Sequence, residues 1–210
     1  MEKYLITIGR TSGSGGRRVG IALAEKLGIV CYDEELIKEV AKKSGFSEEI
    51  IQSYEEKPVK SFLYSLYSGT IAGHGGQVNL PIEQKVFLAQ YNTIKELAER
   101  ESGIFVGRCA EYALEHEKNV IKIFITADEK DCVAHVEETY GFTKKKAEEF
   151  IKKTNRDRSN SYSYYTNKEW GNSSNYDITI NRSALGLDES VEILADFVER
   201  RLRIMEKKEG

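Results

Sequence analysis

Near the N-terminus, a glycine-rich loop separates a predicted strand from a predicted helix. Residues 4–8 form an apolar run of β-type residues, and residues 17–27 have the spacing of an amphipathic helix. Between them lie Gly9, Gly13, Gly15 and Gly16. Glycines let backbone N–H groups turn inward, and the N-terminus of the following helix adds partial positive charge. This order predicts a phosphate-binding loop after the first strand.

The loop departs from the Walker A pattern G-x-x-x-x-G-K-[ST]. When the second glycine of the pattern is aligned with Gly15, Arg10 occupies the position of the first glycine. Gly16 occupies the position of the lysine, and Arg17 occupies the position of the serine or threonine. Because arginine binds phosphate bidentately, Arg10, Arg17 or Arg18 is a candidate replacement for the lysine. The alternative is that Arg17 and Arg18 are solvated residues of the first helical turn. The predicted donor-phosphate residues are Arg10, Ser12, Gly13, Ser14, Gly15, Gly16, Arg17 and Arg18.

Length and charge limit the class of protein. The chain has 210 residues, of which 40% are hydrophobic and 31% charged, and we treat residues 1–210 as a single domain. Its net charge of −3 argues against a nucleic-acid-binding protein held by bulk positive charge. No stretch reaches the ~20 apolar residues that cross a membrane, and the N-terminus has no signal-peptide layout.

The three cysteines favour a reducing compartment. Cys31, Cys109 and Cys132 are widely spaced and form no metal-binding pair, which predicts free thiols. We therefore expect a cytoplasmic protein without a membrane or nucleic-acid partner. The sequence leaves a homo-oligomer open.

Apolar runs and helical patterns alternate along the chain. The predicted strands are residues 4–8, 29–32, 104–106, 120–126 and 176–181. The predicted helices are residues 17–27, 34–44, a helix capped by Ser47, 82–102, 128–140, 144–155 and 188–208. Strands separated by helices imply a three-layer α/β fold in which helices cover both faces of a parallel sheet. Residues 53–82 break this rhythm with both prolines and four glycines, and we interpret them as an insert that binds the acceptor.

Two further residues follow predicted strands, at the sheet edge where ligands bind in such folds. Asp33 follows the second strand, where it could hold a magnesium ion or contact a substrate hydroxyl. It could equally cap the helix that begins at Glu34. Arg108 comes directly after Gly107, which aims a guanidinium into the same crevice. We predict that Arg108 binds phosphate and that Asp33 is the candidate metal ligand and general base.

A cationic run, KKTNRDR at residues 152–158, lies near the predicted end of a helix. A polar, tyrosine-rich stretch follows it. We interpret residues 153–175 as a lid-like segment that brings Arg156 and Arg158 over transferring phosphates. A solvated charge run is the open alternative.

Several motifs, in this order, resemble the cytidylate-kinase-like family of P-loop proteins. They are GSGGRRVG with ALAEKLG, YDEELI, FVGRCAEY, KIFITA, YYTNKEWG and YDITIN, and they extend over nearly the whole chain. The resemblance implies a P-loop NTPase fold of the nucleoside-monophosphate-kinase type, with an NMP-binding insert and a lid. It also implies ATP and Mg²⁺ on the donor side and a nucleoside monophosphate such as CMP as acceptor.

The same resemblance implies roles by position. Residues 13–17 look like the donor-phosphate loop, and Arg108 looks like the acceptor-phosphate arginine of a Gly-Arg-Asp motif. Arg156 and Arg158 look like lid arginines, and Ser183 lies where the adenine would rest. True cytidylate kinases carry acids on both sides of Gly-Arg, whereas this chain has valine and cysteine there. The set that recognises CMP is therefore incomplete.

Three functions stay open from the sequence. The leading hypothesis is an ATP-dependent phosphotransferase of the cytidylate-kinase type. The second is a nucleotide-binding protein without catalysis, which the glycine and arginine at positions 16 and 17 suggest. The third is a P-loop kinase of a small metabolite, because GRRVGIALAEKLGIVCYDEE also resembles shikimate-kinase-type enzymes.

Overall fold

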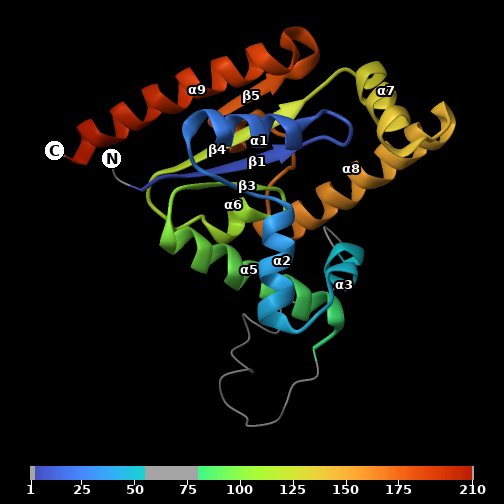
Figure 1. Cartoon of the computed structure of the whole chain (residues 1–210), viewed down its shortest axis with the longest axis horizontal. Helices are drawn as coiled ribbons and strands as arrows, with labels where there is room; N and C mark the ends of the chain where they lie inside the picture. The colour runs from blue at the N-terminus through green and yellow to red at the C-terminus, as the bar shows by residue number, and fades with distance from the viewer. Residues whose placement is uncertain (1–2, 55–79, 210) are drawn as a thin grey trace.

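The structure is a computed structural model, and it describes residues 3–54 and 80–209. Within these ranges, five parallel strands form one sheet in the order β2-β3-β1-β4-β5. The strands are β1 (Leu5–Arg10), β2 (Val30–Tyr32), β3 (Gly103–Val106), β4 (Val120–Thr126) and β5 (Ile178–Asn181). Central β1 pairs with β3 and β4, so that Ile6 lies opposite Ile104 and Ile121. The carboxyl ends of the parallel strands meet at one edge of the sheet (Figure 1).

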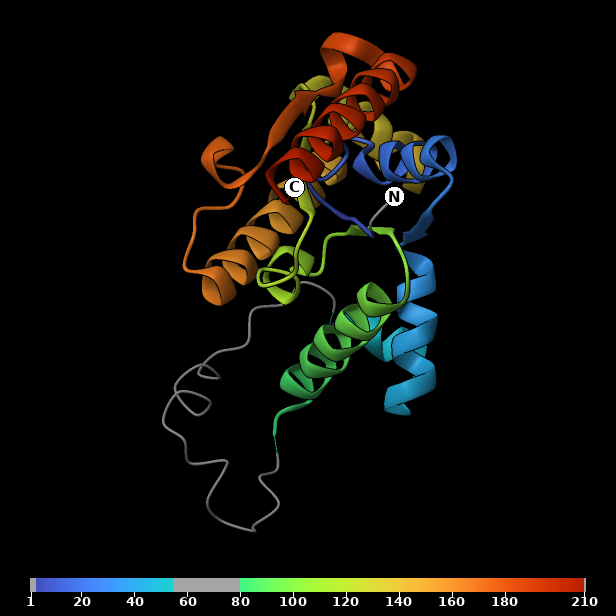
Figure 2. The same ribbon diagram turned by 90° about the vertical axis from the view of Figure 1, so that its left-hand side faces the viewer.

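Helices cover both faces of this sheet (Figures 1 and 2). One face carries α1 (Gly16–Leu27) and α9 (Arg182–Glu209). The other carries α2 (Glu34–Ser44), α3 (Glu48–Ser53), α5 (Ile82–Arg100) and α6 (Ala110–Ala113). At the carboxyl edge of the sheet, β4 is followed by α7 (Glu129–Tyr140) and α8 (Lys144–Thr166), and η1 (Ser173–Asn175) leads to β5. The predicted three-layer α/β fold is confirmed.

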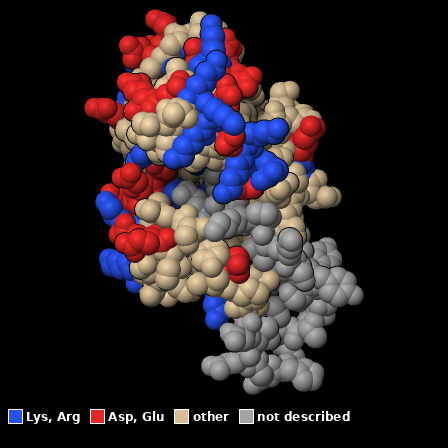
Figure 3. All heavy atoms as spheres, turned by 90° about the vertical axis from the view of Figure 1, so that its right-hand side faces the viewer, with Lys and Arg blue, Asp and Glu red and all other residues tan. Residues whose placement is uncertain are grey.

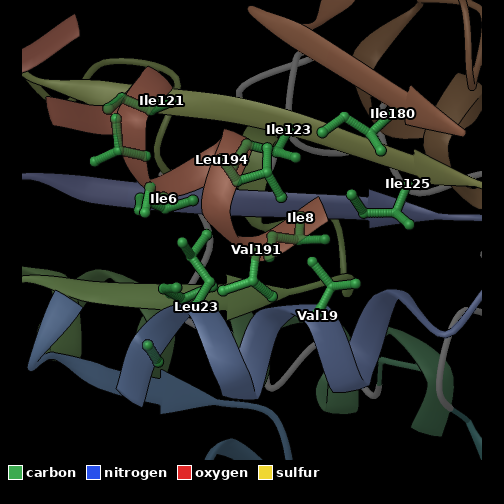
Figure 4. Packing of buried hydrophobic residues seen from close by; sticks show 14 of the residues in the cluster. Ile6, Ile8, Val19, Leu23, Ile121, Ile123, Ile125, Ile180, Val191 and Leu194 are labelled. Carbon is green, nitrogen blue, oxygen red and sulfur yellow. The ribbon is translucent and has the colours of Figure 1, made fainter. Parts of the chain in front are cut away.

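Alternation along the strands produces two hydrophobic cores. Successive side chains of a strand point to opposite faces of the sheet. Ile6 and Ile8 of β1 pack with Val19 and Leu23 beneath α1 and α9 (Figure 4), whereas Leu5 packs on the other face under α2 and α5. Each such side chain is at most 1% exposed, and full burial of one stabilises the fold by about 1.5–3 kcal/mol. The sheet edge above these cores is thus a rigid base for the loops that leave it.

Several local predictions are confirmed by the structure. The strand and helix positions agree to within a few residues, and Ser47 caps α3 by accepting a hydrogen bond from the N–H of Ile50 at 3.4 Å. Cys31, Cys109 and Cys132 are free thiols. The predicted insert, residues 53–82, falls largely on residues 55–79, which lie outside the described ranges.

One predicted helix boundary is wrong, and one short helical segment was not predicted. The helix predicted to end at residue 155 continues as α8 to Thr166, because no glycine or proline interrupts the tyrosine-rich stretch. The helix predicted at residues 188–208 agrees with the part of α9 that follows a break at Gly186, where φ is 78°, whereas the helical residues before the break, from Arg182, were not predicted. Both differences change which side chains reach the carboxyl edge of the sheet.

Candidate functional site

The loop between β1 and α1 wraps the N-terminus of α1. Gly13 and Gly15 have left-handed backbone angles, with φ of 79° and 75°. A Cβ on Gly13 would lie 2.5 Å from the carbonyl oxygen of Cys132 in α7, so only glycine fits there. The Ser14 hydroxyl donates to the Thr11 carbonyl oxygen at 2.7 Å and closes the turn. Because the first N–H groups of a helix have no intrahelical partners, this helix end can bind phosphate.

A cavity of about 490 Å³ opens over this loop, and we call it the loop cavity. Its volume is in the usual range for small-molecule sites. It brings together nine of the predicted site residues: Arg10, Ser12, Gly13, Gly15, Gly16, Arg17, Arg18, Asp33 and Arg158. The opposite wall comes from α7 and α8, including His135, Tyr140, Phe150 and Thr154.

Four predicted residues lie away from the lining of this cavity, of which Arg108 is described below. The side chain of Ser14 is buried and bonded to the loop itself. Arg156 is 67% exposed, and its closest ionic partner is Asp157 at 3.9 Å. The Ser183 hydroxyl accepts a hydrogen bond from the N–H of Asp128 at 2.9 Å, at the start of α7. The predicted adenine contact of Ser183 therefore stays a prediction.

The two predicted lid arginines separate because both lie within α8. Residues two apart in a helix do not share a face. Arg158 turns toward the sheet, where its Nη1 donates to the carbonyl oxygen of Arg10 at 3.1 Å, while Arg156 points to solvent. One turn earlier, Asn155 Oδ1 accepts a hydrogen bond from the N–H of Ser12 at 2.7 Å. Helix α8 is thus bonded directly to the end of β1 and to the loop between β1 and α1.

Positive charge gathers around the loop cavity. Burial lowers the pKa of His135, and the nearby guanidiniums of Arg182 and Arg18 lower it further. Viewed from the side of α7 and α8, Lys and Arg side chains gather across the upper half of the molecule (Figure 3). Such a field attracts a polyanion despite the chain's negative net charge.

Arg182 is a site residue that sequence reasoning missed. Its Nε donates to the carbonyl oxygen of Ser14, and a Cβ on Gly15 would lie 2.9 Å from that nitrogen. Arg182 follows β5 directly, so it stands at the same sheet edge as the residues that follow β1 and β3. Arg182 could have been identified from the sequence because it directly follows the strand predicted at residues 176–181.

Asp33 links the loop to Arg108. One carboxylate oxygen pairs with Nε of Arg17, and Oδ1 lies 3.3 Å from Nη1 of Arg108. Arg17 also pairs with Glu34 at the start of α2. The Asp33 side chain is 13% exposed and that of Arg108 only 2%, so their pair is shielded from solvent. Asp33 stands at the N-cap position of α2 but makes no capping hydrogen bond, because its oxygens face the arginines.

Arg108 lies in a strained turn. Gly107, Arg108 and Cys109 have φ values of 73°, 54° and 51°, which places two consecutive non-glycine residues in the left-handed region. Such residues cost about 1–3 kcal/mol each and persist where the surrounding structure holds them, often at ligand sites. The turn buries the Arg108 guanidinium, whose Nη1 lies 3.3 Å from the carbonyl oxygen of Val106.

A narrow cavity between the ends of β1 and β3, the strand-end cavity, also contains Arg108. Arg10 and Arg158 line both this cavity and the loop cavity. Its other wall includes Glu111, whose pKa burial raises to about 7, against the opposing effects of Lys122, Tyr162 and Arg10. The two cavities therefore meet at a shared pair of arginines.

A third cavity lies between α5 and α8 on the far side of Arg108, and we call it the α5–α8 cavity. Its lining includes Phe87, Gln90, Arg108 and Tyr165. Within the described residues, Nε2 of Gln90 and the Tyr165 hydroxyl are buried and have no hydrogen-bond partner. Phe87 and Tyr165 stack with ring centroids 3.8 Å apart and planes 3° apart. Buried polar groups without a partner are uncommon in folded proteins, and a bound ligand or an ordered water is one way to satisfy them.

The donor set does not fit a magnesium ion held by the protein in this arrangement. Magnesium in such sites is held by one or two carboxylates and by phosphates. Both oxygens of Asp33 face arginines, and Arg17 stands where a Walker loop has its hydroxyl ligand. The described residues contain no cluster of three His, Cys, Asp or Glu side chains that could hold a metal. The role of Asp33 as a metal ligand stays a prediction.

The fold and the loop together define a P-loop kinase fold of the nucleoside-monophosphate-kinase type. The chain belongs to the cytidylate kinase-like family, whose family model matches residues 5–184. None of the curated proteins compared with the chain matches it. Within the described ranges, no helix is both long and apolar enough to cross a membrane.

Two solved structures illustrate the likeness. An uncharacterized protein from Eubacterium ventriosum ATCC 27560 superimposes with a TM-score of 0.70 at 29% identity, over 94% of this chain and 99% of that one. Shikimate kinase from Bacteroides thetaiotaomicron superimposes with a TM-score of 0.56 at 16% identity, over 94% and 99%. The second likeness supports the fold alone.

Proposed function

We propose that the protein is a phosphotransferase that takes its phosphoryl group from ATP and gives it to a nucleoside monophosphate. The observation that carries this proposal is the meeting of two arginine-lined cavities at Arg10 and Arg158. Phosphoryl transfer needs chiefly positioning and neutralisation of charge, and little covalent chemistry from the protein. Membership of a kinase-like family and the P-loop kinase fold support the same reaction class.

In this proposal the loop cavity holds the ATP phosphates. The helix N-terminus and the glycine loop bind them through backbone N–H groups. Arg18 and Arg182 add positive charge near His135 in the cavity wall, whose pKa is lowered by burial and by both guanidiniums. The segment 153–175 contributes through α8, because Asn155 and Arg158 contact the loop directly.

The acceptor lies on the other side, at Arg108 and the α5–α8 cavity. The buried guanidinium of Arg108 binds the acceptor phosphate, and Gln90 and Tyr165 bind a polar group of the same molecule. The described residues of this site do not select one nucleobase over another. A kinase of a small hydroxylated metabolite is the second candidate, which the same unsatisfied pair, Gln90 and Tyr165, also suits.

The test is an ADP-release assay with ATP and MgCl₂ across CMP, dCMP, UMP, AMP, GMP and a set of small hydroxy acids. The proposal expects ADP release that depends on one of the nucleoside monophosphates. ADP release with a hydroxy acid but with none of the nucleoside monophosphates would favour the second candidate, a kinase of a small metabolite. Binding of ATP without release for any acceptor would instead favour a nucleotide-binding protein without catalysis.

A further inference from the structure

Arg10 fills the space between two glycines at the carboxyl edge of the sheet. A Cβ built on Gly16 would lie 2.6 Å from Cβ and 3.1 Å from Cγ of Arg10. A Cβ built on Gly107 would lie 1.8 Å from Nη1 and 2.5 Å from Cζ of Arg10. The aliphatic stem of Arg10 therefore packs on Gly16 in the loop, and its guanidinium lies on the backbone of Gly107, next to Arg108.

A side chain at position 16 would clash with neighbouring atoms, whereas the backbone conformation there does not exclude one. Gly16 is not among the glycines with positive φ, so its backbone would accept another residue. The atoms that obstruct a side chain there are the first carbons of Arg10, which cannot swing aside as a flexible chain end can. If residue 10 were glycine, the nearest remaining obstacle would be Cβ of Ile125 at 3.3 Å, which small adjustments relieve.

Two of the three departures from the Walker pattern, those at positions 10 and 16, are thus one coupled change. An arginine at position 10 excludes a lysine at position 16, and a glycine at position 10 makes room for it. Of the other two candidate cations, Arg17 is engaged with Asp33 and Glu34, and Arg18 lines the loop cavity but not the strand-end cavity. Arg10 instead lines both the loop cavity and the strand-end cavity, where its charge lies between the two proposed phosphate sites.

We propose that Arg10 supplies the phosphate-binding cation that Walker loops take from the lysine at position 16, and that Gly16 and Gly107 are glycines because Arg10 occupies the space beside them. This inference rests on the proposed function, since it assigns a ligand-binding role within the same site. It predicts that the cation can be returned to position 16 by exchanging both residues together.

The experiment measures ATP affinity and melting temperature for the whole chain and five variants. These are Arg10→Gly, Gly16→Ala, Gly16→Lys, Arg10→Gly with Gly16→Ala, and Arg10→Gly with Gly16→Lys. The alanine variants test the steric conflict without a charge, and the lysine variants test the charge. ATP with MgCl₂ is the ligand in every titration.

We expect Arg10→Gly to weaken ATP binding about ten-fold or more. Gly16→Ala and Gly16→Lys should lower the melting temperature, and adding Arg10→Gly should restore it in both cases. Only the variant with glycine at position 10 and lysine at position 16 should also recover ATP affinity, to within about five-fold of the unmodified chain.

Two results would overturn the inference while ATP binding stands. One is unchanged ATP affinity in Arg10→Gly. The other is equal ATP affinity in the two double variants, which would show that a cation at position 16 cannot replace Arg10. Failure of the unmodified chain to bind ATP would overturn the proposed function and this phosphate role together, and the melting temperatures would then report the steric coupling alone.

Discussion

The Asp33 carboxylate lies 3.3 Å from Nη1 of Arg108, so one acid connects the proposed donor loop to the proposed acceptor arginine. Its other oxygen pairs with Arg17 at the start of α1. This arrangement orients two cations without a bound ligand. The Asp33 carboxylate also balances the positive charge of a guanidinium that is only 2% exposed.

The first prediction concerns this acid. Asp33→Asn should lower the free energy of unfolding by about 2–4 kcal/mol, because it removes the carboxylate charge that lies beside the buried Arg108 guanidinium. Urea unfolding measures the loss. The matched control is Glu34→Gln, which removes an exposed partner of Arg17 and should change stability by about 0.5 kcal/mol or less. Equal effects of the two variants would show that the Asp33–Arg108 pair is not stabilising.

The second prediction separates the two substrates. Arg108→Ala should weaken acceptor binding by about 1.5–3 kcal/mol, because it removes a charge-assisted bidentate contact. ATP affinity should stay within about three-fold of the unmodified value. Steady-state kinetics with each substrate varied in turn measures both. If ATP affinity falls as far as acceptor affinity, Arg108 does not belong to the acceptor side.

The third prediction uses the unsatisfied groups of the α5–α8 cavity. Tyr165→Phe and Gln90→Leu should leave the empty protein as stable as before or stabilise it by about 1 kcal/mol, because each removes a buried polar group without a partner. The same changes should raise the KM for the acceptor. Thermal unfolding and acceptor kinetics provide the two readouts.

Tyr112→Phe is the control for the third prediction. Tyr112 belongs to the same aromatic cluster, with its ring centroid 6.2 Å from that of Tyr165, but it does not line the cavity. Its replacement should leave the acceptor KM unchanged. A loss of stability in Tyr165→Phe would mean that the hydroxyl has a structural partner.

The fourth prediction concerns His135 in the wall of the loop cavity. Burial and the guanidiniums of Arg182 and Arg18 lower its pKa, so a polyanion that binds near these arginines should raise it. NMR titration of the histidine side chains, with and without ATP, measures the change. His116, whose side chain is 89% exposed, provides the internal reference. A His135 pKa that stays constant at saturating ATP would place the phosphates elsewhere.

The fifth prediction is a pH dependence from Glu111. Its pKa is about 7 in the folded chain against 4.5 for an ordinary glutamate, so the folded state holds a proton that the unfolded state has lost between these values. Stability should therefore fall as pH rises from about 4.5 to about 7, by on the order of 2–3 kcal/mol. Glu111→Gln should remove this part of the pH dependence. If the stability of the two proteins depended on pH in the same way, the raised pKa of Glu111 would be contradicted.

The core of the site could be predicted from sequence because its signals are local. The first strand, the glycine loop and helix α1 are adjacent in the chain, and the alternation of apolar residues identified each element. Asp33 and Arg108 were found for a related reason, since each follows a strand of a parallel sheet and such ends meet at one edge.

The remaining contributions come from distant segments and needed three dimensions. Arg158 reaches the carbonyl oxygen of Arg10 from the part of α8 that lies beyond its predicted end, and Asn155 bonds to the loop from the same helix. The conflict between Arg10 and a side chain at position 16 depends on where the loop returns, which no spacing rule encodes. The pairing of Arg17 with Asp33 likewise required the packing of α1 beside β2.

The measurement that tests the central claim most directly is ³¹P NMR of the unmodified chain with ATP, MgCl₂ and the acceptor selected by the ADP-release assay. The account predicts that the γ-phosphate signal of ATP decreases while signals of ADP and of a phosphorylated acceptor grow together. Arg108→Ala should slow this exchange about ten-fold or more at low acceptor concentration. A protein that binds ATP but leaves its γ-phosphate signal unchanged with every acceptor would contradict the account and would be a nucleotide-binding protein without catalysis.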